Sequence, residues 1–86
     1  MAGRVEIRLF ATAREAVGVE EIAWDVPETG TALRELLDQL GARHRKLRPI
    51  LPHCRFFVNG ELVGPPGRRR LSAGDRLAIH PPYSGG

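Results

Sequence analysis

Residues 31–41, TALRELLDQLG, place leucines at positions 33, 36, 37 and 40. These positions fall on one helical face, so the segment predicts an amphipathic helix whose apolar stripe is wide enough to cover a sheet. Thr31 is the expected N-cap, and Gly41 is the expected C-terminal stop.

Two alternating segments precede this helix. Residues 5–9, VEIRL, and residues 22–26, IAWDV, place apolar side chains at every second position. This pattern predicts two half-buried strands, paired as an antiparallel hairpin. Residues 11–18 between them are interpreted as a connection. Residues 42–53, which are basic and interrupted by prolines, are expected to be irregular.

Three further strands are predicted after residue 53. Residues 54–58 form one strand, and residues 61–63 form the short strand that returns beside it. The intervening Asn59-Gly60 favours a type I′ turn, because both central positions of that turn need a positive φ. The last strand spans residues 76–80 and ends at a proline, which cannot donate to a ladder.

This element order predicts an α+β fold, with a mixed sheet of about five strands and one main helix on one face. The first and last strands share the core with the helix most simply if they lie side by side at the centre of the sheet. That arrangement is the ubiquitin-like β-grasp. We therefore expect residues 1–86 to form a single domain, with a flexible C-terminal tail at residues 81–86.

Composition narrows the possible functions. A chain of 86 residues has no room for a catalytic cleft and a separate cofactor domain. No apolar run approaches the ~20 residues of a membrane span, and the lone Cys54 cannot form an internal disulfide, so a reduced, cytoplasmic setting is expected. Cys54 itself is interpreted as a small core residue. The three histidines and Cys54 lack metal-ligand spacing, and no phosphate-binding loop is present, so no bound metal or cofactor is expected.

Charge is divided unevenly along the chain. Residues 1–40 carry a net −4 and residues 41–86 a net +7, with basic clusters at Arg43–Arg48 and Arg68–Arg70. Nucleic-acid binding would favour aromatic side chains among these clusters, and none are there. Solvated faces or docking to charged protein surfaces fit better, and a basic RNA-binding module is a rival interpretation.

The sequence ends on a diglycine, which offers nothing to a core. It does offer a thin backbone that can enter a narrow channel, and an uncrowded carboxylate. This predicts chemistry at the terminus of the chain, inside another protein; a frayed tail is the alternative.

Four motifs together resemble the small, sulfur-carrying subunits of molybdopterin synthases. They are IRLFA at residues 7–11 followed by Arg14-Glu15, FVNG at 57–60, LSAGDRLAI at 71–79 and HPPYSGG at 80–86. The resemblance covers essentially the whole chain. Its most specific part is the ending, since the thiamine-pathway sulfur carrier also ends in Gly-Gly but typically lacks the Pro-Pro pair.

The resemblance implies a cosubstrate rather than a free-standing enzyme. An E1-like adenylating partner would use ATP to activate the carboxylate of Gly86, and a persulfide sulfur donor would convert it to a thiocarboxylate. The large subunit of the synthase would then receive the tail and pass its sulfur to cyclic pyranopterin monophosphate. The residues expected to thread into the partner are Pro81, Pro82, Tyr83, Ser84 and Gly85.

The resemblance also implies partner contacts at Phe10 and Leu62, on the exposed sheet face near the tail, and at His80. Arg14 matches a basic position of the family and would anchor an acidic residue of either partner. The family commonly has an apolar aromatic residue where this chain has His80. Phe10 could equally be a core residue, and Arg14 could be a solvated arginine.

Two related functions share all these features except the detail of the ending. One is a carrier that sends its sulfur to thiamine, cysteine or tRNA thiolation. The other is a ubiquitin-like modifier, in which a lysine attacks the activated Gly86.

Overall fold

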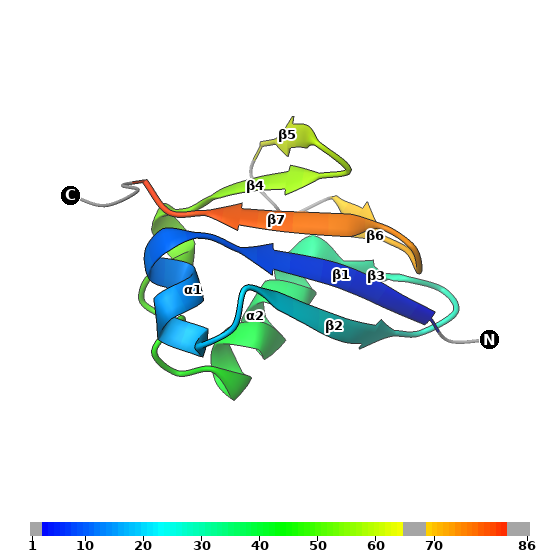
Figure 1. The fold of residues 1–86 in the computed structure, drawn as a ribbon. Coiled ribbons are helices and arrows are strands. Elements are labelled where there is room, and N and C mark those ends of the chain that lie inside the picture. The colour runs from blue at the N-terminus through cyan, green and yellow to red at the C-terminus, as the bar shows by residue number, and fades with distance from the viewer. Residues whose placement is uncertain (1–2, 65–68, 83–86) are drawn as a thin grey trace.

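The first and last strands lie side by side and parallel at the centre of a mixed sheet (Figure 1). In the computed structural model, which describes residues 3–64 and 69–82, this sheet has five strands in the order β2-β1-β7-β4-β5. Their bounds are β1 Gly3–Leu9, β2 Glu21–Val26, β7 Arg76–His80, β4 Arg55–Val58 and β5 Glu61–Val63. A separate two-stranded sheet pairs β3 (Thr31–Ala32) with β6 (Arg70–Leu71). The predicted antiparallel hairpin and the predicted central pair are both confirmed.

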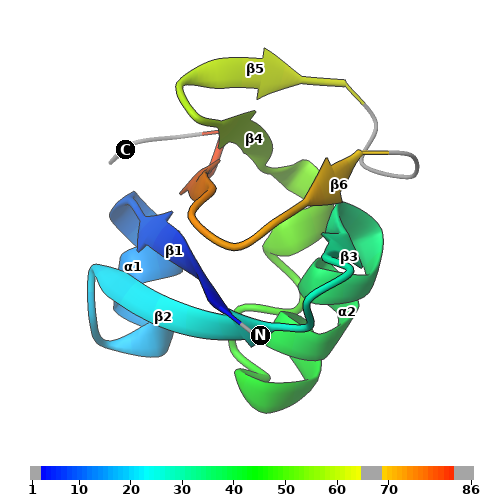
Figure 2. The ribbon, with the colours of Figure 1, turned by 90° about the vertical axis from the view of Figure 1, so that its right-hand side faces the viewer.

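Helix α2 (Leu33–Arg43) covers one face of the sheet (Figure 2). Its four leucines are buried, as their spacing predicts, and they join the inward side chains of the central strands in one core. Burying a leucine side chain contributes about 1.5–3 kcal/mol, so this stripe holds the helix on the sheet. The inward side chains of the sheet are Val5, Ile7, Leu9, Trp24, Val26, Phe56, Val58, Leu77 and Ile79.

A second helix, α1, spans Ala11–Val17, where the sequence was interpreted as a connection. That interpretation was wrong. The helix begins after Phe10 with no side-chain cap, and it ends at Gly18, which adopts a left-handed φ of 94°. Ala13 is fully buried against the core, so tertiary packing stabilises a helix too short to form alone.

Both predicted ends of the main helix were also wrong. Thr31 lies in β3, and Ala32 takes the N-cap position without a side-chain hydrogen bond. The helix passes through Gly41 and ends at Arg43, whose guanidinium lies 4.7 Å from the centroid of the Trp24 ring. This cation–π contact gives the last residue of the helix a partner on the sheet.

The segment expected to be irregular contains a short 3-10 helix, η1 (Leu51–His53). The Cys54 N–H donates to the Leu51 carbonyl across the end of η1 at 3.1 Å. Strand β4 therefore begins at Arg55, one residue later than predicted.

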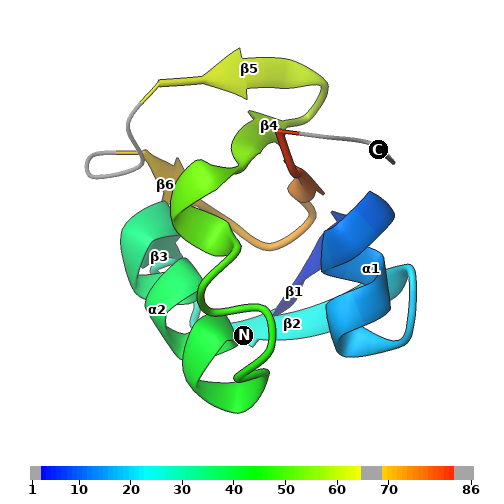
Figure 3. The same cartoon turned by 90° about the vertical axis from the view of Figure 1, so that its left-hand side faces the viewer.

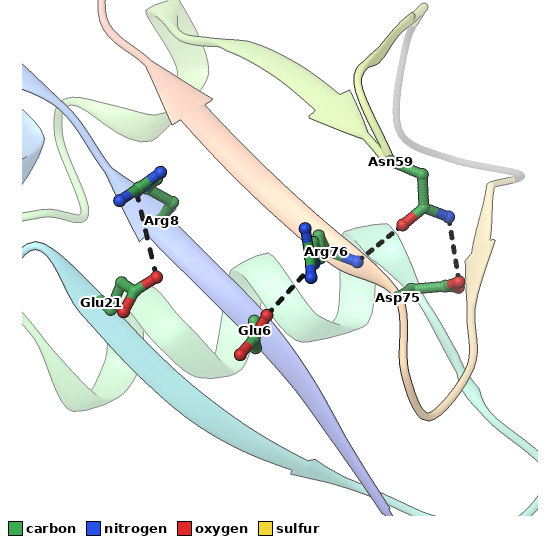
Figure 4. Close-up of polar contacts among 6 residues, drawn as sticks. All are labelled: Glu6, Arg8, Glu21, Asn59, Asp75 and Arg76. Carbon is green, nitrogen blue, oxygen red and sulfur yellow. Dashed lines mark hydrogen bonds and ion pairs between the residues drawn. The ribbon is translucent and has the colours of Figure 1, made fainter.

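The turn between β4 and β5 is tied to the start of β7 (Figure 4). Asn59 and Gly60 have φ values of 52° and 83°, which confirms the predicted turn. The Asn59 side chain donates to Asp75 Oδ1 at 3.1 Å and accepts the Arg76 N–H at 2.9 Å. The Ser72 N–H donates to Asp75 Oδ2 at 2.8 Å, and this bond, followed by the bond from Asn59, lowers the pKa of Asp75 below its ordinary value of 3.8. These bonds fix the start of β7 at Arg76, and therefore also the position of the chain at its other end, His80.

Candidate functional site: the root of the tail and the outer face of the sheet

The chain leaves the sheet at the end of its central strand. Strand β7 ends at His80, beside the end of β1, helix α1 and the start of β4 (Figure 3). Pro81 is half-buried there and Pro82 is exposed. The other predicted tail residues, Tyr83, Ser84, Gly85 and Gly86, lie outside the described residues, as does Arg68 of the second basic cluster. The described structure therefore defines the root of the tail.

Aromatic side chains gather on the outer face of the sheet at this root. The rings of Phe10 and His80 stack with centroids 4.1 Å apart and an interplanar angle of 14°. The centroid of the Phe57 ring lies 5.0 Å from that of the His80 ring, in an edge-to-face arrangement. Leu62 pairs across the β4–β5 ladder with Phe57 and is 56% exposed. We call Phe10, Phe57, Leu62 and His80 the apolar patch.

Three of the four predicted partner contacts thus lie in one patch. Alternation along the strands explains the arrangement, because opposite residues in a ladder share a face. Ala78 lies opposite Phe57, so a small side chain leaves room between the aromatic rings. Phe57 is a patch residue that the sequence analysis missed. The signal was available, since two successive phenylalanines in an alternating strand must point to opposite faces.

Arg14, the fourth predicted contact, lies elsewhere. It is exposed on α1 and lines a separate hollow beside Gly18 and Val19. The structure therefore does not bring Arg14 into the apolar patch.

Ion pairs occupy the other half of the outer face (Figure 4). Arg76 pairs with Glu6 at 3.3 Å, and Arg8 approaches Glu21 at 4.0 Å. Arg4 and Asp25 pair at 3.2 Å further along β1. Exposed pairs of this kind contribute at most about 1 kcal/mol each to folding. Their effect here is to neutralise the sheet beside the apolar patch, where a hollow of about 530 Å³ runs between the two halves.

Within residues 3–64 and 69–82, no group of three or more His, Cys, Asp or Glu side chains is arranged to hold a metal ion. None of the helices in that part of the chain is long and apolar enough to cross a membrane. The patch offers apolar area and aromatic edges, which are typical of protein interfaces.

The side chain of Cys54 packs against the core, and its thiol is unreactive at neutral pH. It is half-buried against the core, and its thiol donates to the Ile50 carbonyl at 3.3 Å. Burial raises the pKa of the thiol to about 11. Because the thiolate is the reactive form, Cys54 is a poor nucleophile at neutral pH, consistent with its interpretation as a packing residue.

Comparison with known protein families gives a match over nearly the whole chain. The sequence model of the ThiS family matches residues 7–86. A molybdopterin synthase sulfur carrier subunit of Chlamydomonas reinhardtii is 36% identical over 96% of this chain and 99% of its own length. Small archaeal modifier protein 3 of Haloferax volcanii is 37% identical over 95% of this chain and 98% of its own length. The resemblance drawn from the sequence motifs is confirmed.

Solved structures give the same result for the fold. SAMP1 from Haloferax volcanii superimposes with a TM-score of 0.81 and 32% identity, covering 98% of this chain and 100% of that one. A protein–protein complex of subunits 1 and 2 of the molybdopterin-converting factor from Helicobacter pylori contains a chain that matches with a TM-score of 0.66 and 26% identity, each chain covered in full. The predicted β-grasp is confirmed.

Proposed function

The chain belongs to the ThiS family, and from that premise we propose that it is the sulfur-carrier subunit of a molybdopterin synthase. The observation that carries this proposal is the full-length similarity to a molybdopterin synthase sulfur carrier subunit. The ending, Pro-Pro-Tyr-Ser-Gly-Gly, supports it.

The proposed chemistry takes place at the carboxylate of Gly86. A carboxylate is a poor electrophile, so an E1-like partner joins it to AMP and releases pyrophosphate from ATP. The terminal sulfur of a persulfide donor attacks the acyl carbon, and AMP leaves. A thiol then cleaves the sulfur–sulfur bond, which leaves a thiocarboxylate on Gly86. This anion is the nucleophile that donates sulfur to cyclic pyranopterin monophosphate.

The described residues supply docking and positioning in this scheme. Pro81 and Pro82 restrict φ at the root of the tail, which lowers the entropy lost when the tail is ordered in a channel. The apolar patch lies directly beside this root and offers a surface to the large subunit. The Helicobacter pylori complex of subunits 1 and 2 supports that pairing.

Reconstitution of the synthase tests the proposal. Thiocarboxylated chain, mixed with the large subunit from the same organism and cyclic pyranopterin monophosphate, is expected to yield the dithiolene product. A chain lacking Gly86 is the control and should yield none. The proposal would be contradicted if no product formed although the same large subunit is active with another carrier.

A ubiquitin-like modifier is the second candidate, favoured by the similarity to small archaeal modifier protein 3. In that function a lysine of another protein attacks activated Gly86 and forms an isopeptide bond. Conjugates that survive a denaturing gel and disappear on deletion of Gly86 would support it. A carrier serving thiamine, cysteine or tRNA thiolation would instead form the thiocarboxylate but give no product with the large subunit.

A further inference from the structure

A second, cationic hollow adjoins the apolar patch at the root of the tail. It measures about 320 Å³ and is lined by His53, Arg55, Phe57, His80, Pro81 and Pro82. Arg55 and His80 are opposite each other in the β4–β7 ladder, so their side chains share the outer face. Among residues 3–64 and 69–82, no acidic residue lines this hollow.

Arg55 differs from the other arginines of the outer face. Arg4, Arg8 and Arg76 are each ion-paired with a glutamate or aspartate of a neighbouring strand or turn. Arg55 is exposed and has no carboxylate within ion-pair distance in residues 3–64 and 69–82. Three arginines of this face are thus neutralised by ion pairs, whereas the charge of Arg55 has no such partner among the described residues. Arg55 lies beside the root of the tail.

We propose that Arg55, assisted by His53, forms a carboxylate-binding subsite that receives an acidic side chain of the large synthase subunit. This inference rests on the proposed function, which makes the large subunit the partner of this surface. The planar guanidinium binds a carboxylate through two parallel hydrogen bonds, and a ring nitrogen of His53 can add a third donor.

A carboxylate carried by a protein fits this hollow because the hollow is continuous with the apolar patch. Phe57 and His80 belong to both the hollow and the apolar patch, so a partner that covers the patch also reaches Arg55. The ion pair would sit at the edge of that contact. Charge pairs in this position set orientation and the rate of association more than they add affinity. Arg55 would thus help align the tail with the channel it enters.

The test compares Arg55→Gln with Arg4→Gln, using the full-length chain and the purified large subunit. Arg4 is a matched control, since it is an exposed arginine of the same face at the far end of β1, already paired with Asp25. We expect Arg55→Gln to raise Kd by about 2- to 5-fold, the range for an exposed charge pair, and Arg4→Gln to leave it unchanged. Arg55→Glu should raise Kd by about tenfold or more, because two carboxylates would then face each other.

Two further measurements, at high salt and with the diglycine removed, separate an effect of the Arg55 charge on Kd from other effects of the substitution. At roughly 0.5 M salt the difference in Kd between Arg55→Gln and the unaltered chain should narrow, because added ions weaken an exposed charge pair. The effect should persist in chains lacking Gly85 and Gly86, since the subsite is outside the channel. Matching thermal midpoints for all variants would show that folding is unaffected.

The outcomes distinguish the subsite from the function on which it rests. If the unaltered chain does not bind the large subunit, both fail. If it binds and Arg55→Gln binds equally well at low salt, the carboxylate subsite is overturned and the proposed function stands. An Arg55→Gln effect that vanishes with the diglycine would also overturn the subsite, because Arg55 would then act through the tail.

Discussion

Phe10 and His80 are 70 positions apart in sequence, yet their rings stack 4.1 Å apart at the outer face of the sheet. Phe10 follows β1 and His80 ends β7, so the contact joins the two central strands at the end where the tail begins. Pro81 comes directly after His80. A partner that covered this stack would therefore also contact the root of the tail, so under the proposed function docking and insertion of the tail would be coupled.

The first prediction uses two exposed aliphatic residues, Leu62 and Val19, which are 56% and 51% exposed. Leu62 belongs to the apolar patch, whereas Val19 lies after α1. Leu62→Ala should weaken binding to the large subunit by about tenfold, as loss of a well-packed interface side chain does, while Val19→Ala should not. Titration calorimetry measures both. A larger loss of affinity for Val19→Ala than for Leu62→Ala would indicate that the interface lies at α1 and not at the patch.

The second prediction concerns the stiffness of the tail root. Pro82→Gly should weaken docking by about 2- to 5-fold, since removing a proline restores about 0.4–1 kcal/mol of conformational freedom. Adenylation of Gly86 in excess activating enzyme should proceed normally. Pro49→Gly, at an exposed proline of the segment before η1, is the control. Equal affinity of the Pro82→Gly and unaltered chains would argue against a pre-extended tail.

The third prediction separates Cys54 from sulfur transfer. With its pKa raised to about 11, the thiol should react with iodoacetamide at pH 8 roughly a hundredfold more slowly than an ordinary cysteine. The same chain unfolded in urea should regain the ordinary rate. Cys54→Ala should load sulfur at Gly86 as well as the unaltered chain does. Loss of loading in this variant would assign the thiol a chemical role.

The fourth prediction concerns acid stability. Because the pKa of Asp75 is lowered in the folded state, its stabilisation is present above pH ~4, the ordinary pKa range, and is lost as the pH falls through the lower folded value. Asp75→Asn should cost about 1–2 kcal/mol at pH 7 through the bonds from Ser72 and Asn59. Its difference from the unaltered chain should narrow below pH ~4, since protonated Asp75 resembles asparagine.

Urea unfolding at several pH values measures this difference. Asp25→Asn is the matched control, because Asp25 forms one exposed ion pair with Arg4 and should cost less than about 0.5 kcal/mol. A constant penalty for Asp75→Asn from pH 7 to pH 3 would contradict the assignment.

Local patterns were sufficient to identify the strands of the five-stranded sheet and the existence of the main helix, although not its ends. Alternation identified the first two strands, Asn59-Gly60 identified the hairpin, and the leucine spacing identified α2. Helix α1 was not predicted because no local sequence signal marks its start. Phe10 offers no capping side chain, and Ala11 begins the helix with a positive φ of 49°. The end of α2 at Arg43 likewise depends on the Trp24 ring, which lies on another element.

Individual residues of the candidate site could be predicted from the sequence, but their arrangement in one patch could not. The family resemblance pointed to Phe10, Leu62 and His80 separately. Their convergence depends on the register of β7 with both β1 and β4, which no local pattern specifies. The proposed role of Arg55 was missed for a similar reason. It rests on a contrast that only the structure shows: the other arginines of the outer face form ion pairs, whereas Arg55 has no such partner among the described residues.

The most direct test of the sulfur-carrier chemistry proposed at Gly86 is the intact mass of the chain after incubation with ATP, the activating enzyme and a persulfide donor. A chain lacking Gly86 serves as the control. We expect a mass increase equal to the replacement of one oxygen by sulfur, absent from the control. An unchanged mass, with an activating enzyme that loads another carrier under the same conditions, would contradict it.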